Sequence, residues 1–295
     1  MTDILITGGQ GQVGIELAAL AWPDGVKLHV PARAELDLTD AGSVRGYFAG
    51  KSFAAVINPA AYTAVDKAEG EIGEAFAVNA LGPALLAEAT KAAGTPLIHI
   101  STDYVFDGSK NGVYNEEDPI NPLGVYGASK EAGEQAVRSG NPRSVILRTA
   151  WVVSPHRQNF IKTMLRVGAE RPVLRVVNDQ HGCPTSAADI AEAVSTIALR
   201  LIADSRAPTG TYHFVNAGET TWWGLAQQVF GQAKSLGGPS PTVEPITTEE
   251  YPTPAKRPKN SRLSTAKLNA DFAIHPRPWQ AAVDEIVGKL IAAPA

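Results

Sequence analysis

Short runs of apolar and β-branched residues alternate with alanine-rich segments through the first half of the chain. The apolar runs predict strands at residues 3–7, 27–30, 54–58, 96–101 and 144–153. The segments between them have the apolar spacing of helices at residues 13–21, 41–49 and 74–93. Compact apolar strands separated by helices are typical of a parallel sheet covered on both faces. We therefore expect an α/β protein with a Rossmann-type, doubly wound parallel sheet, whose strand ends form one ligand-binding edge.

The second half of the chain is less regular. Helical spacing predicts further helices at residues 159–170, 187–203 and 221–236, and a β-branched run predicts a strand at residues 211–216. Residues 237–258 are rich in Pro, Thr and Ser, which predicts a loop. We expect a smaller α/β unit built from several excursions out of the sheet. The predicted boundaries are 1–153 with 186–218 for the sheet domain, and 154–185 with 219–295 for the smaller domain.

The composition is that of an ordinary globular protein. The 295 residues are 44% hydrophobic and 19% charged, and the formal net charge of −4 argues against a broad nucleic-acid surface. The single cysteine, Cys183, cannot form an internal disulfide, and no Cys/His metal spacing exists. The amino terminus lacks the pattern of a signal peptide, and no apolar run approaches the roughly 18 residues of a membrane span. We therefore expect a cytoplasmic protein with no membrane or nucleic-acid partner. A homodimer is compatible with the sequence, which does not determine the oligomeric state.

A glycine-rich turn follows the first predicted strand. Gly8, Gly11 and Gly14 in "TGGQGQVG" have the spacing G-x-x-G-x-x-G between a strand and a helix. Glycine permits a sharp turn and lets the backbone approach a pyrophosphate, toward which the next helix directs its free N–H groups. In this context the triplet predicts a dinucleotide-binding loop, although a tight structural turn is the alternative.

The end of the second predicted strand suggests which dinucleotide is bound. A free ribose 2′-hydroxyl usually meets an acidic residue there, whereas this chain carries Arg33. Because an arginine suits a 2′-phosphate, the sequence favours NADP(H) and leaves NAD(H) possible. A solvated loop charge is the alternative interpretation of Arg33. We expect Asp37 and Leu38 beside the adenine, with Asp37 accepting a hydrogen bond from its amino group.

Candidate catalytic residues follow the fourth predicted strand. Tyr126 and Lys130 are four residues apart at the start of a predicted helix, so both face the same side. A nearby ammonium favours the phenolate, so we expect Lys130 to lower the pKa of Tyr126. Such a tyrosine can give a proton to a carbonyl oxygen while hydride reaches the carbon. Thr102, at the strand end, can donate a further hydrogen bond to that oxygen.

These features together resemble the extended short-chain dehydrogenase/reductase family. Within that family, the chain resembles the dTDP-4-dehydrorhamnose reductases. The segments that carry this resemblance are residues 60–69, 101–108, 125–130, 148–153, 178–185 and 257–263. The resemblance implies NAD(P)H-dependent reduction of the C4 keto group of dTDP-4-dehydro-L-rhamnose to dTDP-L-rhamnose. It also implies that the sheet domain binds the dinucleotide and that the smaller domain binds the nucleotide-sugar.

The resemblance implies a role for each matching residue. The cofactor pyrophosphate is expected to contact Gly11, Gln12 and Val13, and the cofactor ribose and nicotinamide to lie near Ala61, Tyr62 and Thr63. Tyr126 is the expected proton donor, and Lys130 holds the nicotinamide ribose. The keto-sugar is expected to contact Thr102, Asp103 and Trp151. The nucleotide diphosphate is expected to contact Arg257, Lys259 and Arg262. A solvated charged loop is the alternative for these last three residues.

Two departures from the family pattern are visible. Pro59 stands where the family usually has alanine, which removes a backbone N–H and stiffens the exit of the third strand. Some family members hold magnesium through glutamates at a dimer interface, and Glu16 could be such a ligand. Because no convincing partner ligands occur in the second half, we predict no metal.

Two rival functions remain open. A nucleotide-sugar dehydratase of the same superfamily typically has an Asp-Glu pair after the threonine, whereas Asp103 is followed here by Tyr104. That absence favours simple reduction over dehydration or epimerisation. The second rival is a non-catalytic, dinucleotide-binding regulatory subunit, and the intact Tyr126 and Lys130 pair argues against it.

Overall fold

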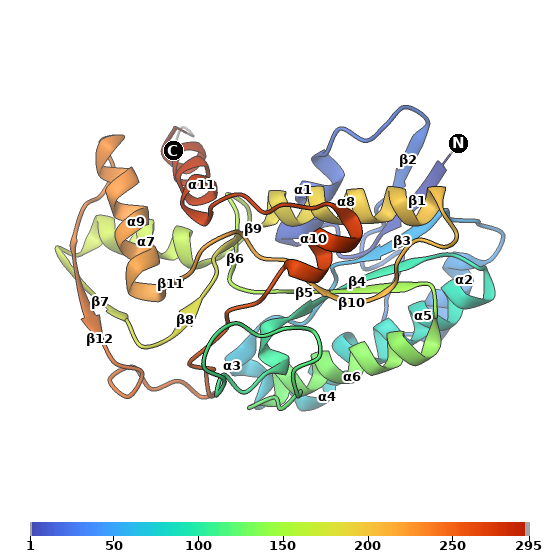
Figure 1. The fold of residues 1–295 in the computed structure, drawn as a ribbon, viewed down its shortest axis with the longest axis horizontal. Coiled ribbons are helices and arrows are strands. Elements are labelled where there is room, and N and C mark those ends of the chain that lie inside the picture. The colour runs from blue at the N-terminus through green and yellow to red at the C-terminus, as the bar shows by residue number, and fades with distance from the viewer. Residues whose placement is uncertain (1, 293–295) are drawn as a thin grey trace.

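The computed structural model describes residues 2–292 and contains a central sheet of six parallel strands (Figure 1). Its order across the sheet is β10-β5-β4-β3-β1-β2. The strands are β1 (Thr2–Ile6), β2 (Val26–His29), β3 (Ala55–Asn58), β4 (Leu97–Thr102), β5 (Ser144–Thr149) and β10 (Gly210–His213). The predicted doubly wound α/β fold is confirmed.

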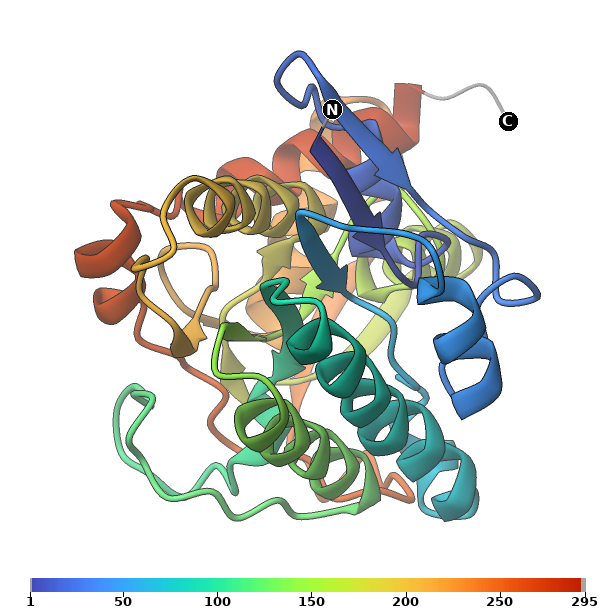
Figure 2. The same ribbon diagram turned by 90° about the vertical axis from the view of Figure 1, so that its right-hand side faces the viewer.

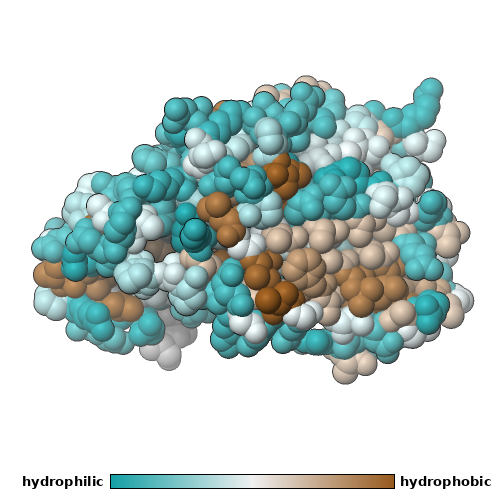
Figure 3. Space-filling view, turned by 90° about the horizontal axis from the view of Figure 1, so that it is seen from below, coloured by the Kyte–Doolittle hydropathy of each residue, from teal (hydrophilic) through white to brown (hydrophobic). Residues whose placement is uncertain are grey.

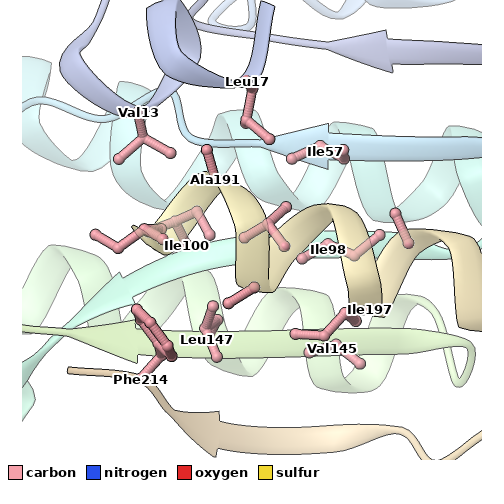
Figure 4. Packing of buried hydrophobic residues seen from close by; sticks show 14 of the residues in the cluster. Val13, Leu17, Ile57, Ile98, Ile100, Val145, Leu147, Ala191, Ile197 and Phe214 are labelled. Atoms are coloured by element: carbon pink, nitrogen blue, oxygen red, sulfur yellow. The ribbon is translucent and has the colours of Figure 1, made fainter. Parts of the chain in front are cut away.

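Helices cover both faces of this sheet (Figures 1 and 2). One face packs against α1 (Gln12–Ala19), α8 (Ala187–Ala203) and α10 (Ala266–Phe272). The other face packs against α2 (Ala41–Phe48), α5 (Gly82–Ala92) and α6 (Val125–Gly140). Figure 4 shows the first core, in which Val13 and Leu17 of α1 and Ala191 of α8 lie over Ile57 and Ile98 of the sheet. Alternate residues of each strand thus enter opposite cores.

The chain order reverses within the sheet between β1 and β3. Strand β1 pairs with β2 on one side and with β3 on the other. The connections therefore leave in opposite directions, and a crevice forms at the carboxyl ends of these strands. The short helices α3 (Val65–Ala68) and α4 (Ile72–Phe76) and the 3₁₀ turn η2 (Asp103–Val105) follow β3 and β4 near this edge.

A second unit lies beyond the carboxyl edge of the sheet (Figure 1). Its helices α7 (Phe160–Glu170), α9 (Trp222–Ser235) and α11 (Trp279–Ala292) pack around a shared apolar core. Three small two-stranded pairings complete it: β7 (Val173–Val177) with β12 (Thr242–Ile246), β8 (His181–Gly182) with β11 (Thr220–Thr221), and β6 (Val152–Val153) with β9 (Thr185–Ser186). The predicted domain boundaries stay a prediction. Helix α10 lies in the segment 219–295, which was assigned to the smaller domain, but it packs on the sheet.

Three predicted elements differ from the structure. The strand expected over 144–153 ends at Thr149 and resumes as β6, because Trp151 has a left-handed φ of 48°. The helix expected over 74–93 contains a π turn at Ala77–Leu81, which ends two residues before Pro83, whose missing N–H removes a helical hydrogen bond. The loop expected over 237–258 is wrong at β12, where Pro245 is tolerated in a strand with only one neighbour.

The surface mixes polar and apolar residues. Figure 3 shows apolar residues gathered across the lower centre and right of the face seen from below, with polar residues around them. Exposed large hydrophobic residues of the chain include Ile72, Phe76 and Leu81, in α4 and the following π turn. None of the helices within residues 2–292 is long and apolar enough to cross a membrane.

Candidate active site

A cavity of about 780 Å³ opens at the reversal point of the sheet. The glycine loop, the ends of β1, β3 and β4, the start of α6 and the segment after β5 all line it. Its walls include the predicted site residues Gly8, Gly11, Gln12, Val13, Gly14, Arg33, Asp37, Leu38, Ala61, Thr63, Thr102, Asp103, Tyr126, Lys130 and Trp151. The fold therefore brings most of the predicted cofactor and catalytic residues to one cavity.

The backbone of the glycine loop approaches itself so closely that Gly14 has no room for a side chain. Gly8 has a φ of 58°, and its carbonyl accepts a hydrogen bond from the Gly11 N–H at 2.9 Å. A Cβ added to Gly14 would lie 2.3 Å from the Gly8 carbonyl oxygen, which is an overlap. Gly11 precedes α1 without a side-chain cap, so the N–H groups of the first turn have no side-chain acceptor. This cradle fits the pyrophosphate of a dinucleotide.

Arg33 and Asp37 lie together at one end of the cavity. The Nε atom of Arg33 is 3.8 Å from Oδ2 of Asp37, and the Arg33 side chain is 69% exposed. The Thr39 amide and hydroxyl donate to Oδ1 of Asp37, and these bonds lower the pKa of that carboxyl. An exposed guanidinium beside an ionised carboxylate is compatible with contact to a 2′-phosphate. That contact stays a prediction.

Tyr126 and Lys130 are both buried at the start of α6. The Tyr126 ring packs edge-on against Tyr104, with ring centroids 5.4 Å apart. The Nζ atom of Lys130 donates to the Ile100 carbonyl at 2.7 Å. The helix geometry therefore places both side chains on the cavity side of α6, as the four-residue spacing predicts.

The expected effect of Lys130 on Tyr126 is wrong. Burial raises the pKa of Tyr126, Asp103 adds to this rise, and the Thr102 hydroxyl opposes it. The ammonium of Lys130 is engaged by the backbone of β4, and burial lowers the pKa of Lys130 itself to about 8. Desolvation thus outweighs the cation that the spacing suggested. Tyr126 is a neutral phenol at physiological pH, which is the form that can donate a proton.

Thr102 and Asp103 form a hydrogen-bonded pair beneath the cavity. The Thr102 hydroxyl donates to Oδ1 of Asp103 at 3.0 Å, and both side chains are buried. Burial raises the pKa of Asp103 to about 6, although nearby hydroxyls, including that of Ser261, oppose this rise. Within residues 2–292, Oδ2 of Asp103 has no hydrogen-bond partner. An under-satisfied carboxyl in a cavity wall is suited to binding a polar ligand.

Asp103 is expected to make stability depend on pH. Its raised pKa means that the folded state keeps the proton to higher pH than the unfolded chain does. The stabilisation is therefore complete below pH ~4 and is lost as the pH rises through ~6. From the usual 3.8 to about 6, the shift corresponds to about 3 kcal/mol. In urea unfolding at about pH 4 and about pH 7, the parent should lose about this much stability relative to Asp103→Asn; the comparison with the variant removes the opposite contribution of the buried His99 and His213, whose lowered pKa values destabilise both proteins at low pH.

Asp107→Asn is the matched control for this measurement. Hydrogen bonds from Ser109 and Asn121 lower the pKa of Asp107 to about 2. The stability that ionised Asp107 contributes is therefore lost only below pH ~4. Asp107→Asn should keep the parent's difference in unfolding free energy between about pH 4 and about pH 7. If Asp103→Asn also kept that difference, the raised pKa assigned to Asp103 would be refuted.

Two tryptophans from different units meet in the cavity wall. Trp151 follows β5 and stacks on Trp222 of α9, with ring centroids 3.6 Å apart and planes 10° apart. The neighbouring Trp223 does not line the cavity, and its Nε1 donates to the Val243 carbonyl at 3.0 Å. No local signal separates the two tryptophans, because only the packing of α9 against the β5–β6 connection decides which one lines the cavity.

Four predicted residues do not line the cavity. The Tyr62 hydroxyl donates to Glu71, away from the cavity. The remaining three are cations paired with acids: Arg257 with Asp66 at 2.7 Å, Arg262 with Glu219 at 3.0 Å and Lys259 with Glu249 at 3.9 Å. Burial raises the pKa of Tyr104, and Arg257 is near enough to that phenol to oppose the rise. Their contact with a diphosphate stays a prediction.

Sequence reasoning overlooked the segment after β6. Arg157, Gln158, Asn159 and Phe160 line the cavity beside the glycine loop. Their signal is weak because no local motif marks them. Glu16 lies 3.3 Å from His156 of the same segment, and no group of three potential metal ligands occurs within residues 2–292. The absence of a metal therefore stays a prediction.

The chain is similar over nearly its whole length to dTDP-4-dehydrorhamnose reductases of several organisms. The family model described as RmlD substrate binding domain matches residues 1–291. A dTDP-4-dehydrorhamnose reductase of Sinorhizobium fredii is 45% identical over 289 residues, covering 98% of this chain and 97% of that protein. A crystal structure of a Clostridium acetobutylicum dTDP-4-dehydrorhamnose reductase has a TM-score of 0.91 at 38% identity, covering 98% of this chain and 99% of that one. A Bacillus anthracis dTDP-4-dehydrorhamnose reductase, solved in complex with NADP, has a TM-score of 0.90 at 34% identity, covering 98% and 100%.

Proposed function

Because the chain belongs to the RmlD substrate-binding-domain family, with dTDP-4-dehydrorhamnose reductases as its relatives, we infer that it is an NADP(H)-dependent reductase. It reduces the C4 keto group of dTDP-4-dehydro-L-rhamnose to give dTDP-L-rhamnose. The observation that carries this inference is that Tyr126, Lys130 and Thr102 face one cavity that continues into the glycine loop.

The residues present fit a dinucleotide, which supplies the hydride when it is bound. The glycine loop and the first turn of α1 provide N–H donors for its pyrophosphate, and Arg33 provides a cation for a 2′-phosphate. Ala61 and Thr63 line the cavity between the glycine loop and Tyr126, where we assign the ribose and nicotinamide. Tyr62 is assigned a supporting role, through its backbone hydrogen bond to Asn79 at 2.8 Å.

Tyr126 is assigned as the proton donor. Its raised pKa keeps the phenol protonated, so it can give that proton as negative charge develops on the substrate oxygen. Thr102 is assigned to donate a second hydrogen bond to the same oxygen, after releasing Asp103. Asp103 then accepts from a sugar hydroxyl through its unpartnered oxygen.

Lys130 is assigned to hold the nicotinamide ribose by its ammonium. Burial lowers its pKa to about 8, while the carboxylate of Glu134, one helical turn further along α6, opposes this shift. Lys130 is therefore mostly charged at neutral pH, although less firmly than an exposed lysine. A lysine with this pKa can also exchange protons at the site near neutral pH.

The substrate is assigned to the side of the cavity nearest the second unit. Trp151, stacked on Trp222, offers an aromatic face to a sugar ring. Arg257, Lys259 and Arg262 are assigned to the nucleotide diphosphate, for which each must exchange its present carboxylate partner. These ion pairs are partly exposed, so their exchange costs little.

Reduction fits the cavity better than dehydration does. A dehydratase needs a second carboxyl group beside the reacting carbon, as acid and base. Asp103 and Asp37 are the acids that line the cavity within residues 2–292, and Asp37 lies at the far end beside Arg33. The residue after Asp103 is Tyr104 and not a second acid, so the carboxylate pair that dehydration needs is missing.

NADPH consumption tests this function. Absorbance should fall when dTDP-4-dehydro-L-rhamnose is added to the protein with NADPH, and dTDP-L-rhamnose should form in equal amount. With the keto-sugar omitted, the absorbance should stay constant. Tight binding of NADPH without turnover would instead favour a regulatory, non-catalytic subunit. A cytoplasmic location and a homodimer remain predictions from the sequence.

A further inference from the structure

The segment between β6 and α7 folds back onto the glycine loop. Nε of Arg157 donates to the Gln10 carbonyl at 2.6 Å. Oε1 of Gln12 accepts from the Ser154 hydroxyl at 2.8 Å and from the Asn159 amide at 3.0 Å. These bonds join residues more than a hundred positions apart, so the second unit is tied directly to the loop that begins α1.

Arg157 is held in an unusual backbone conformation. Its φ is 54°, in the left-handed region that residues other than glycine and asparagine rarely adopt. Such a conformation persists when surrounding contacts impose it, and it occurs often at binding sites. Here the conformation directs the Arg157 side chain to Gln10, at the amino-terminal end of α1.

Most of the Arg157 guanidinium is free to bind a ligand. Within residues 2–292, its hydrogen bonds and ion pairs involve only Nε, which leaves Nη1 and Nη2 unengaged. The residue lines the same cavity as Gly9, Gln10 and Gly11. A guanidinium, the uncapped N–H groups and the positive end of α1 thus converge on one region.

We propose that Arg157 is a cofactor-binding residue contributed by the second unit, whose guanidinium contacts the pyrophosphate of the dinucleotide on the glycine loop. The proposal rests on the proposed function, since it takes a dinucleotide as the ligand. The pyrophosphate is the group assigned because Arg157 is anchored at Gln10, between Gly8 and Gly11. The 2′-phosphate has its own cation, Arg33, near Asp37.

The test measures equilibrium binding of NADPH, NADH and reduced nicotinamide riboside, without keto-sugar. Arg157→Gly and Arg157→Asn remove the guanidinium and keep a residue that adopts a positive φ readily. Both variants are expected to bind NADPH and NADH about 10- to 100-fold more weakly than the parent, since charge-assisted hydrogen bonds are lost. Binding of the riboside, which lacks both phosphates of the pyrophosphate, should change little. Arg166→Ala removes an exposed arginine of α7 that pairs with Glu170, and it should bind all three ligands like the parent.

Three outcomes would overturn the proposal. NADPH affinity within about twofold of the parent in both variants would show that the guanidinium touches no anion. A loss for NADPH but not NADH would move the contact to the 2′-phosphate. An equal loss for the riboside would indicate general damage to the site. If one variant fails to fold, the other decides the matter. The test measures binding and no turnover. A protein without reductase activity could therefore still confirm the Arg157 contact, and loss of that contact would leave the proposed reductase function standing.

Discussion

Replacing Tyr126 by phenylalanine is expected to lower turnover by about two to four orders of magnitude. The phenol faces the cavity with its pKa raised by burial, so it carries a proton that the phenyl ring lacks. Nothing else changes in shape, and the ring still packs edge-on against Tyr104. The affinity for NADPH should therefore stay close to that of the parent. Steady-state kinetics with the keto-sugar and fluorescence titration with NADPH separate the two quantities.

Tyr212→Phe is a suitable control for this experiment. Tyr212 is also a buried tyrosine, but its hydroxyl donates to Asp271 of α10 at 2.7 Å, and it does not line the cavity. Its loss should affect stability and leave the turnover number unchanged. Turnover of Tyr126→Phe at the parent rate would remove Tyr126 from the role of proton donor.

Replacing Arg148 by leucine is expected to destabilise the fold by about 3–5 kcal/mol. Arg148 of β5 forms a two-pronged ion pair with Glu134 of α6, at 2.8 Å and 2.7 Å, and both side chains are at most 1% exposed. Leucine would leave the Glu134 carboxylate in the interior without this partner. The free energy of unfolding from urea titration measures the effect.

Two further variants make this prediction specific to a buried charge. Arg138 pairs with the same Glu134 at 3.0 Å but is 37% exposed, so Arg138→Leu should cost about 0–1 kcal/mol. The double variant Arg148→Leu with Glu134→Leu removes both buried charges and should recover much of the loss. A cost for Arg148→Leu as small as that of Arg138→Leu would contradict the argument.

The parts of the site that could be predicted from the sequence are those set by neighbouring residues. The glycine spacing predicted a narrow turn, and a Cβ on Gly14 would overlap the Gly8 carbonyl. The four-residue spacing predicted that Tyr126 and Lys130 face one cavity. Alternation of apolar strands and helices predicted the parallel sheet, whose carboxyl edge collects these residues. Each inference needs only local backbone geometry, which short stretches of sequence determine.

Only the tertiary structure decided the electrostatics and the contribution of the second unit. The pKa of Tyr126 rises because distant segments exclude water from it, and spacing along a helix cannot report that burial. Trp222 joins Trp151, and Arg157 reaches Gln10, through packing between segments far apart in the chain. Periodicity shows which face of an element is buried, but it does not show which other element covers that face. For that reason the sequence alone determined the fold class and the local motifs, whereas long-range packing determined how their chemical groups are tuned and completed.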